Sequence, residues 1–114
     1  MRIHYLEIVT PDVDAICVAY EKLHGVRFGP PEPGLGNART APLEGGGLLG
    51  VRAPLREDEA PGVRPYLGVD DAEAAVREAA AAGGQVALPP MELPGFGKCA
   101  IYLQGGVDHG LWQP

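Results

Sequence analysis

The feature that most constrains the fold of this chain is a set of turn and helix-boundary residues that occurs twice, in the same order. The two members of each pair lie 59 or 60 residues apart: Asp12 and Asp71, Gly25 and Gly84, Pro30 and Pro89, Gly45 and Gly105, and Gly50 and Gly110. These residue types bound regular structure, and matching turns in one order are hard to obtain by chance. The sequence therefore predicts a duplicated module, the alternative being two unrelated α+β halves whose glycine-rich turns coincide.

Each half of the sequence predicts the same order of elements. In the first half, strands are expected at 3–10, 26–29, 38–43 and 48–53, with a helix that Asp12 caps and Gly25 ends. In the second half, strands are expected at 64–69, 85–88, 98–103 and 109–113, with a helix at 72–82 and a loop at 89–97. Each half thus reads β-α-β-β-β.

This order predicts an α+β fold class, in which two tandem βαβββ modules form a curved mixed sheet around a cleft. The length of 114 residues suits one domain. Its modules are expected at 1–54 and 64–114, joined by a charged, proline-containing linker at 55–63. Because concave surfaces between repeated units collect binding functions, a small-molecule ligand is expected in the cleft between the modules.

Composition and charge limit the partners. Nine basic and fifteen acidic residues give a net charge of -6, which argues against nucleic acid and against an anionic membrane surface. No apolar run approaches the ~20 residues of a membrane span, and no signal-peptide pattern is present. The two cysteines, Cys17 and Cys99, lack metal-binding spacing and are expected to be reduced and buried. The cytoplasm is therefore the expected compartment.

The alternation of strand 3–10 places Tyr5 and Glu7 on one mixed face, opposite the core residues Leu6 and Ile8. Arg64 and Tyr66 are expected to face the same cleft from the second module. An arginine there suits a ligand that carries a carboxylate or a phosphate. Glu7 is a candidate general base, because a carboxylate in an apolar cleft can have a raised pKa. The competing interpretation is a structural ion pair between Glu7 and Arg64.

The chain resembles the vicinal oxygen chelate superfamily, also called the glyoxalase/bleomycin resistance/dioxygenase family. The resemblance covers nearly the whole chain and is carried by the segments EIVTPDVDAICVAYEKLHG, GGGLLGV, YLGVDDAEAAVREAAAAGGQV, LPPMELPGFGKCAIYL and HGLWQP. It implies metal ligands at four inward strand positions, which by the helix and turn landmarks are Tyr5, Val51, Arg64 and Leu111. None of these side chains is a normal divalent-metal ligand, so neither a metal nor another cofactor is expected.

The resemblance leaves the activity open, because the family includes lyases, epimerases, dioxygenases and drug-binding proteins. We expect a metal-free protein that binds a small organic ligand through Tyr5, Glu7, Val51, Arg64, Tyr66, His109 and Leu111. One alternative is a metal-dependent lyase or dioxygenase with displaced ligands such as Glu7 and His109. Another is a metal-free enzyme in which Glu7 or His109 acts as acid or base. The family resemblance also implies a homodimer.

Overall fold

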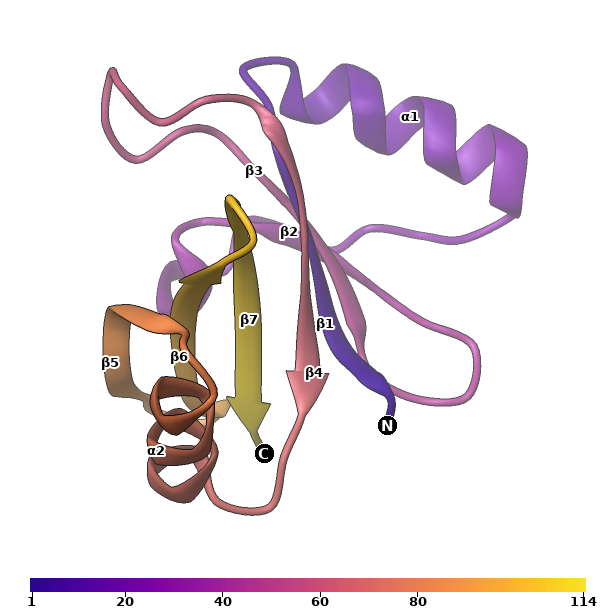
Figure 1. Cartoon of the computed structure of the whole chain (residues 1–114). Coiled ribbons are helices and arrows are strands. Elements are labelled where there is room, and N and C mark those ends of the chain that lie inside the picture. Colours follow the sequence, from indigo (N-terminus) through magenta and orange to yellow (C-terminus); the bar gives the residue numbers. More distant parts are fainter. The chain divides into compact units, whose positions relative to one another are not determined.

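The computed structural model describes all 114 residues and contains two α-helices, one short 3-10 helix and seven β-strands (Figure 1). The chain divides into two compact units, each described separately below. The N-terminal unit comprises Leu6–Val63, and the C-terminal unit comprises Met1–Tyr5 together with Arg64–Pro114. The helices and strands confirm the predicted α+β class. Neither helix is long and apolar enough to cross a membrane.

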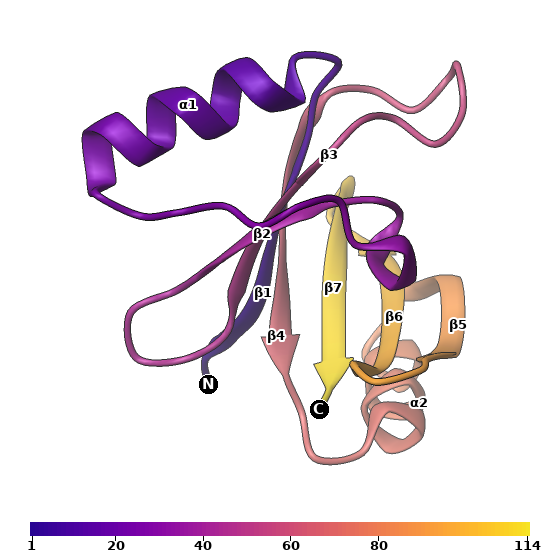
Figure 2. The ribbon, with the colours of Figure 1, turned by 180° about the vertical axis from the view of Figure 1, so that it is seen from behind.

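The N-terminal unit contains most of strand β1 (Ile3–Val9), helix α1 (Val13–His24) and strands β2 (Arg39–Pro42) and β3 (Leu48–Arg52). The strands are hydrogen-bonded in the order β2-β3-β1, with β2 antiparallel to β3. Helix α1 lies against this group of strands (Figure 2). A core of buried residues fills the space beneath the helix and consists of Ile8, Cys17, Phe28, Ala41, Leu49 and Val51.

Helix α1 begins after Asp12 and ends at Gly25, as predicted, but its first turn is capped differently. The side chain of Asp12 makes no capping hydrogen bond, and its backbone carbonyl accepts from the amide of Ile16 at 3.0 Å. Gly25 has φ 68° and ψ 23°, a left-handed conformation that glycine adopts without steric cost. The boundaries were therefore predicted correctly, while side-chain capping by Asp12 was wrong.

The strand predicted at 26–29 is absent. The amide of Phe28 donates to the carboxylate of Glu21 at 2.9 Å, so it is not available to a neighbouring strand. The amide of Gly29 bonds the carbonyl of Thr40 at 2.9 Å, which joins this segment to β2 through a single backbone hydrogen bond. The segment therefore runs beside β2 without forming a ladder.

The C-terminal unit contains β4 (Gly62–Gly68), α2 (Ala72–Ala81), β5 (Gln85–Leu93), β6 (Gly97–Gln104) and β7 (Val107–Gln113). The strands are hydrogen-bonded in the order β4-β7-β6-β5. β4 and β7 are parallel, while β7, β6 and β5 are antiparallel to their neighbours, so the sheet is mixed. The order β-α-β-β-β predicted for the second half is confirmed. β4 begins at Gly62, inside the predicted linker 55–63.

Strand β5 is longer than predicted, because it continues through Pro89 and Pro90 into the expected loop 89–97. Proline lacks the amide that a central strand needs, but β5 is the edge strand and its ladder shifts register between Val86 and Leu88 and between Leu88 and Met91. An edge strand with irregular pairing tolerates two prolines. The expected loop shrinks to the turn 94–96.

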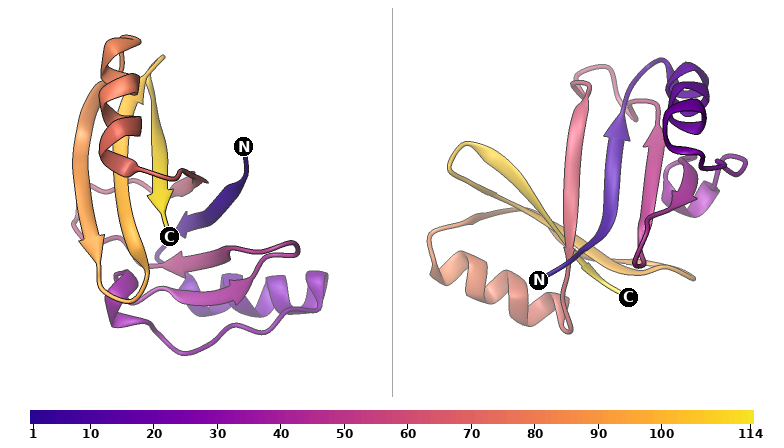
Figure 3. Two further views of the ribbon diagram at one scale, coloured as in Figure 1. Left: turned by 90° about the horizontal axis from the view of Figure 1, so that it is seen from below. Right: turned by 90° about the vertical axis from the view of Figure 1, so that its right-hand side faces the viewer.

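Helix α2 covers one face of the antiparallel part of this sheet (Figure 3, left). Asp71 caps the helix as predicted, with its carboxylate accepting from the amide of Ala74 at 3.0 Å. The amide of Ala72 donates to the side-chain oxygen of Gln113 on β7 at 2.9 Å. This bond identifies the face of β7 that α2 covers. Both cysteines are buried and neither forms a disulfide, as expected.

Candidate functional site

Alternation along β7 sorts its side chains onto two faces. Gln113 bonds the start of α2, so Leu111 and His109, two and four residues before it, lie on the α2 face. The register agrees, because Leu111 is paired with Ala100 of β6 and with Leu67 of β4. The sequence placed Leu111 and His109 on the open face with Tyr66, and that placement was wrong. The open face of β7 instead carries Asp108, Gly110 and Trp112.

Three aromatic side chains form a cluster on the open face of the C-terminal unit. The ring of Tyr5 stacks on that of Trp112 with centroids 4.9 Å apart, and Tyr66 meets both rings edge-on, at 5.9 Å from Tyr5 and 5.5 Å from Trp112. All three residues are buried, with 3 to 5% of their surface exposed. The indole nitrogen of Trp112 donates to the carbonyl of Phe96 at 2.8 Å. The cluster is therefore a rigid apolar floor.

Gly110 allows the ring of Tyr66 to lie directly on β7. A β-carbon at this position would be 2.5 Å from Cδ2 of Tyr66, which is closer than real side chains approach. The orientation of Tyr66 thus depends on glycine, which has no side chain, at its register partner Gly110.

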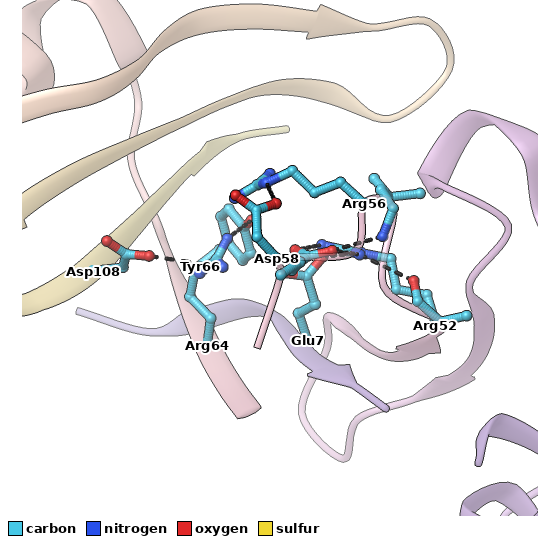
Figure 4. Close-up of polar contacts among 10 residues, drawn as sticks. Glu7, Arg52, Arg56, Asp58, Arg64, Tyr66 and Asp108 are labelled. Carbon is cyan, nitrogen blue, oxygen red and sulfur yellow. Dashed lines mark hydrogen bonds and ion pairs between the residues drawn. The ribbon is translucent and has the colours of Figure 1, made fainter. Parts of the chain in front are cut away.

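Arg64 lies beside this cluster, with its contacts drawn in Figure 4. Its Nη1 donates to the hydroxyl of Tyr66 at 3.3 Å, and its guanidinium carbon is 5.9 Å from the centre of the Tyr66 ring. Its Nη2 lies 3.8 Å from the carboxylate of Asp108, which is half exposed. These are long contacts for a guanidinium group. The predicted association of Arg64 with Tyr66 on one face is present in the structure.

His109 takes part in structural contacts on the other face. Its ring stacks on Tyr102 of β6 with centroids 4.8 Å apart and planes 14° apart. Its Nε2 lies 3.0 Å from the carbonyl oxygen of Gln104, and a nitrogen facing a carbonyl must carry the proton and donate. These contacts fix the ring and its tautomer on the α2 face.

In the N-terminal unit, Val51 is fully buried in the core beneath α1. The sequence placed it on the ligand-facing side of its strand, which was wrong by one residue. Arg52 is the residue of β3 that points to the Glu7 side, and its Nε donates to Glu7 at 2.9 Å. The predicted ion pair of Glu7 with Arg64 joins residues of different units and stays a prediction.

Arg52 is the centre of a buried ionic cluster. Its Nη1 and Nη2 each donate to one oxygen of Glu59 at 2.8 Å. These bonds add to the one from Nε to Glu7, and Figure 4 labels both Arg52 and Glu7. The hydrogen bonds from Arg52 lower the pKa of Glu59 to about 2, although burial acts in the opposite direction. The same partnership with Glu59 is the main reason why the pKa of Arg52 is raised. Arg52 and Glu59 are therefore both ionised at neutral pH.

The sequence did not single out Arg52 or Glu59. One signal was available: an arginine ends the apolar strand LLGVR, and the acidic run Glu57-Asp58-Glu59 follows within seven residues. A buried arginine requires an anionic partner, and a partner that near in sequence is easily reached.

Comparisons with known proteins agree with this geometry. No family model matches the sequence. The chain is 32% identical over 116 residues to CFP32, a protein provisionally named a glyoxylase, of Mycobacterium bovis and of Mycobacterium tuberculosis. The match covers 96% of this chain and 44% of each relative, so the chain spans less than half the length of the curated relatives it matches.

Solved structures match almost the whole chain. A methylmalonyl-CoA epimerase from Mycobacterium tuberculosis has a TM-score of 0.78 at 18% identity, over 98% of this chain and 87% of that one. A hypothetical protein from Bacillus halodurans C-125 has a TM-score of 0.76 at 18% identity, over 99% and 94%. A Streptomyces coelicolor methylmalonyl-CoA epimerase in complex with 2-nitronate-propionyl-CoA has a TM-score of 0.72 at 21% identity, over 99% and 96%. The chain thus has the fold of these structures, and its similarity to a protein named a glyoxylase fits the resemblance to the vicinal oxygen chelate superfamily.

The superfamily resemblance implies metal ligands on the open faces of its strands, and the donor set here does not fit a metal. In the N-terminal unit the open-face positions hold Glu7 on β1 and Arg52 on β3, and in the C-terminal unit they hold Tyr5 on β1, Arg64 and Tyr66 on β4, and Asp108 and Trp112 on β7. Guanidinium and indole groups cannot ligate a divalent cation, and in each unit the carboxylate already faces an arginine that would repel the cation. Nowhere in the chain do three or more His, Cys, Asp or Glu side chains gather as a group that could hold a metal ion.

Proposed function

We propose that the protein is a member of the vicinal oxygen chelate superfamily that binds a small organic anion without a metal, and that Arg64 and Tyr66 receive the anionic group. The observation that carries the proposal is the position of Arg64. Its guanidinium group lies beside an aromatic cluster, and its contacts include one of 3.3 Å to the hydroxyl of Tyr66 and one of 3.8 Å to the carboxylate of Asp108.

The chemistry of Arg64 supports an anionic ligand. A guanidinium group prefers two parallel hydrogen bonds of about 2.8 Å to a carboxylate or phosphate. The ion pair with Asp108 is 3.8 Å long and that carboxylate is 47% exposed, so this pair is weak. A ligand carboxylate can replace it and also accept from the hydroxyl of Tyr66. The buried ring of Tyr5 meets the ring of Tyr66 edge-on at 5.9 Å and so fixes the position of Tyr66 beside Arg64.

The names of similar proteins supply the first probes. The relatives are named for a glyoxylase, and one solved neighbour binds methylmalonyl-CoA. A carboxylate-bearing thioester is therefore one candidate ligand, and a simple aromatic carboxylate is another. The proposal concerns binding, and an assay for conversion of the bound molecule has two informative results. Turnover that depends on Glu7 would add an acid–base step, and turnover that needs an added metal would replace the proposal.

Isothermal titration calorimetry tests this proposal on chelator-treated protein. The probes are methylmalonyl-CoA, benzoate and inorganic phosphate. We expect at least one to bind in the presence of chelator, and we expect Arg64→Lys to weaken it by tenfold or more, because lysine cannot bond bidentately. Arg56→Lys is the matched control, since Arg56 is an exposed arginine paired only with Asp58. Equal affinity of wild type and Arg64→Lys, or binding only after a metal is restored, would overturn the proposal.

We further propose that the protein works as a homodimer in the cytoplasm. The curated relatives are more than twice as long as the matched stretch, which leaves room for a second unit of this size in one chain. A second copy of this chain would serve the same purpose. Two cysteines that form no disulfide suit a reducing compartment. Light scattering at micromolar concentration tests the dimer, and a monomer mass would contradict it.

A further inference from the structure

Residues 53–61 form an exposed strap that a single buried side chain holds in place. The strap contains no helix or strand, and within it only Pro54 and Glu59 are not exposed. Leu55, its largest apolar residue, is 64% exposed, whereas the side chain of Glu59 is only 9% exposed. A segment with so little apolar burial opens easily unless a polar contact retains it. Arg52 makes such contacts, mainly with Glu59 and also from Nη1 to the carbonyl of Ala53 at 3.2 Å.

The contact has the geometry of a bound carboxylate. Both oxygens of Glu59 face Nη1 and Nη2 of Arg52 at 2.8 Å, the two-pronged arrangement in which arginine binds free carboxylates. Nε of Arg52 is already bonded to Glu7, which holds the guanidinium plane in a fixed direction. The side chain of Arg52 is 6% exposed, so water hardly competes for it. Arg52 is a preorganised receptor whose open side is filled by the strap.

We propose that Arg52 is a carboxylate-binding site that Glu59 occupies from within the chain, and that a ligand carboxylate displaces Glu59 and releases the strap. The proposal goes beyond the function assigned to Arg64, because it concerns another arginine in the N-terminal unit. The carboxylate of Glu7 lies 2.9 Å from the same guanidinium group. A monocarboxylate therefore enters more readily than a phosphate dianion.

Removal of Glu59 makes the site testable with acetate as the probe. The side chain of Glu59 acts at an effective concentration in the millimolar range or above, as expected for a short tether. We expect acetate to raise the melting temperature of Glu59→Ala relative to chloride at equal ionic strength, and to act at concentrations at least about tenfold lower than in wild type. Glu57→Ala, in the same strap but exposed, should behave like wild type.

Two further variants keep this test decisive. The double variant Arg52→Lys/Glu59→Ala should lose the response to acetate, because lysine cannot donate two parallel hydrogen bonds to one carboxylate. If Glu59→Ala does not fold, Glu59→Gln keeps the volume and should still respond to acetate more strongly than wild type. An equal acetate response in the Glu59 and Glu57 variants, or no response in a folded Glu59 variant, would overturn the site.

Release of the strap is measured in the wild type by limited trypsin digestion after Arg56. We expect 0.5 M acetate to accelerate this cleavage at least about threefold over chloride, because displacement of Glu59 frees the strap. Inorganic phosphate at equal ionic strength should accelerate it less. Glu59→Gln should be cleaved quickly in either salt. Cleavage of the wild type that is the same in acetate and in chloride would overturn the displacement step.

Discussion

The carboxylate of Glu59 accepts two hydrogen bonds of 2.8 Å from the guanidinium group of Arg52, and both side chains are more than nine-tenths buried. The pKa of Glu59 falls from its usual 4.5 to about 2 as a result. Since the folded-state pKa is the lower one, the stabilisation is complete above about pH 4.5 and is lost as the pH falls toward 2.

Replacement of Glu59 by glutamine should therefore flatten the acid side of the stability profile. We expect the free energy of unfolding of Glu59→Gln to vary less than that of wild type between pH 4.5 and 2, by at most about 3 kcal/mol. Urea denaturation at several pH values measures this difference, with Glu57→Gln as the control that removes a neighbouring exposed charge. Parallel profiles for wild type and Glu59→Gln would contradict the ion pair.

Val51→Ala should destabilise the protein without changing ligand affinity. Val51 is fully buried in the core beneath α1, so removing two methyl groups should cost about 1–3 kcal/mol. Val107, a strand valine that is 55% exposed, provides the control, and Val107→Ala should cost less than about 0.5 kcal/mol. Chemical denaturation and calorimetry with the same ligand distinguish the two roles. Weaker ligand binding by folded Val51→Ala would show instead that Val51 belongs to the binding site.

Gly110→Ala should displace the ring of Tyr66 and weaken ligand binding. Its β-carbon would lie 2.5 Å from Cδ2 of Tyr66 and 2.7 Å from the carbonyl oxygen of Pro65, and the backbone atom cannot move aside cheaply. We expect a loss of stability of about 1–3 kcal/mol together with weaker binding. Gly62→Ala is the control, because a β-carbon at Gly62 would meet nothing within 4 Å. Identical affinity in both variants would show that Tyr66 does not contact the ligand.

His109→Ala tests whether this histidine is structural or chemical. Its ring stacks on Tyr102 and donates to the carbonyl of Gln104, so its loss should cost about 1 kcal/mol of stability and leave ligand affinity unchanged. Thermal denaturation and calorimetry on the same samples give both quantities. Lost turnover of any substrate, with ligand affinity and fold intact, would instead make His109 an acid or base.

The sequence predicted the order of elements well where turn chemistry decides it. Gly25 needs the left-handed conformation and Asp71 caps a helix, and both bound the elements they were expected to bound. It failed at 26–29 and in the extent of β5. The amide of Phe28 is bonded to a distant carboxylate, and Pro89 and Pro90 are tolerated only because β5 is an edge. Neither condition is visible in local sequence.

The face of a strand was harder to predict than its position. In β3 and β7, apolar residues occupy both sides, since Leu48 and Leu49 are adjacent and so are Leu111 and Trp112. Alternation alone cannot then tell the core side from the open side. Two of the positions carried over from the superfamily, Val51 and Leu111, are each one residue away from an open-face residue, Arg52 and Trp112. Strand β1 was assigned correctly because charged Glu7 interrupts its apolar residues.

The most direct test of this account is the metal content of the purified protein, measured by elemental analysis together with calorimetric titration of Ni²⁺, Zn²⁺, Fe²⁺ and Mn²⁺. The open face of each unit carries an arginine that faces a carboxylate, and no group of three or more His, Cys, Asp or Glu side chains could hold a metal ion. We therefore predict less than about 0.1 metal ion per chain, and ligand binding that survives a chelator. One tightly bound metal ion per chain, with ligand binding that disappears when it is removed, would contradict the account.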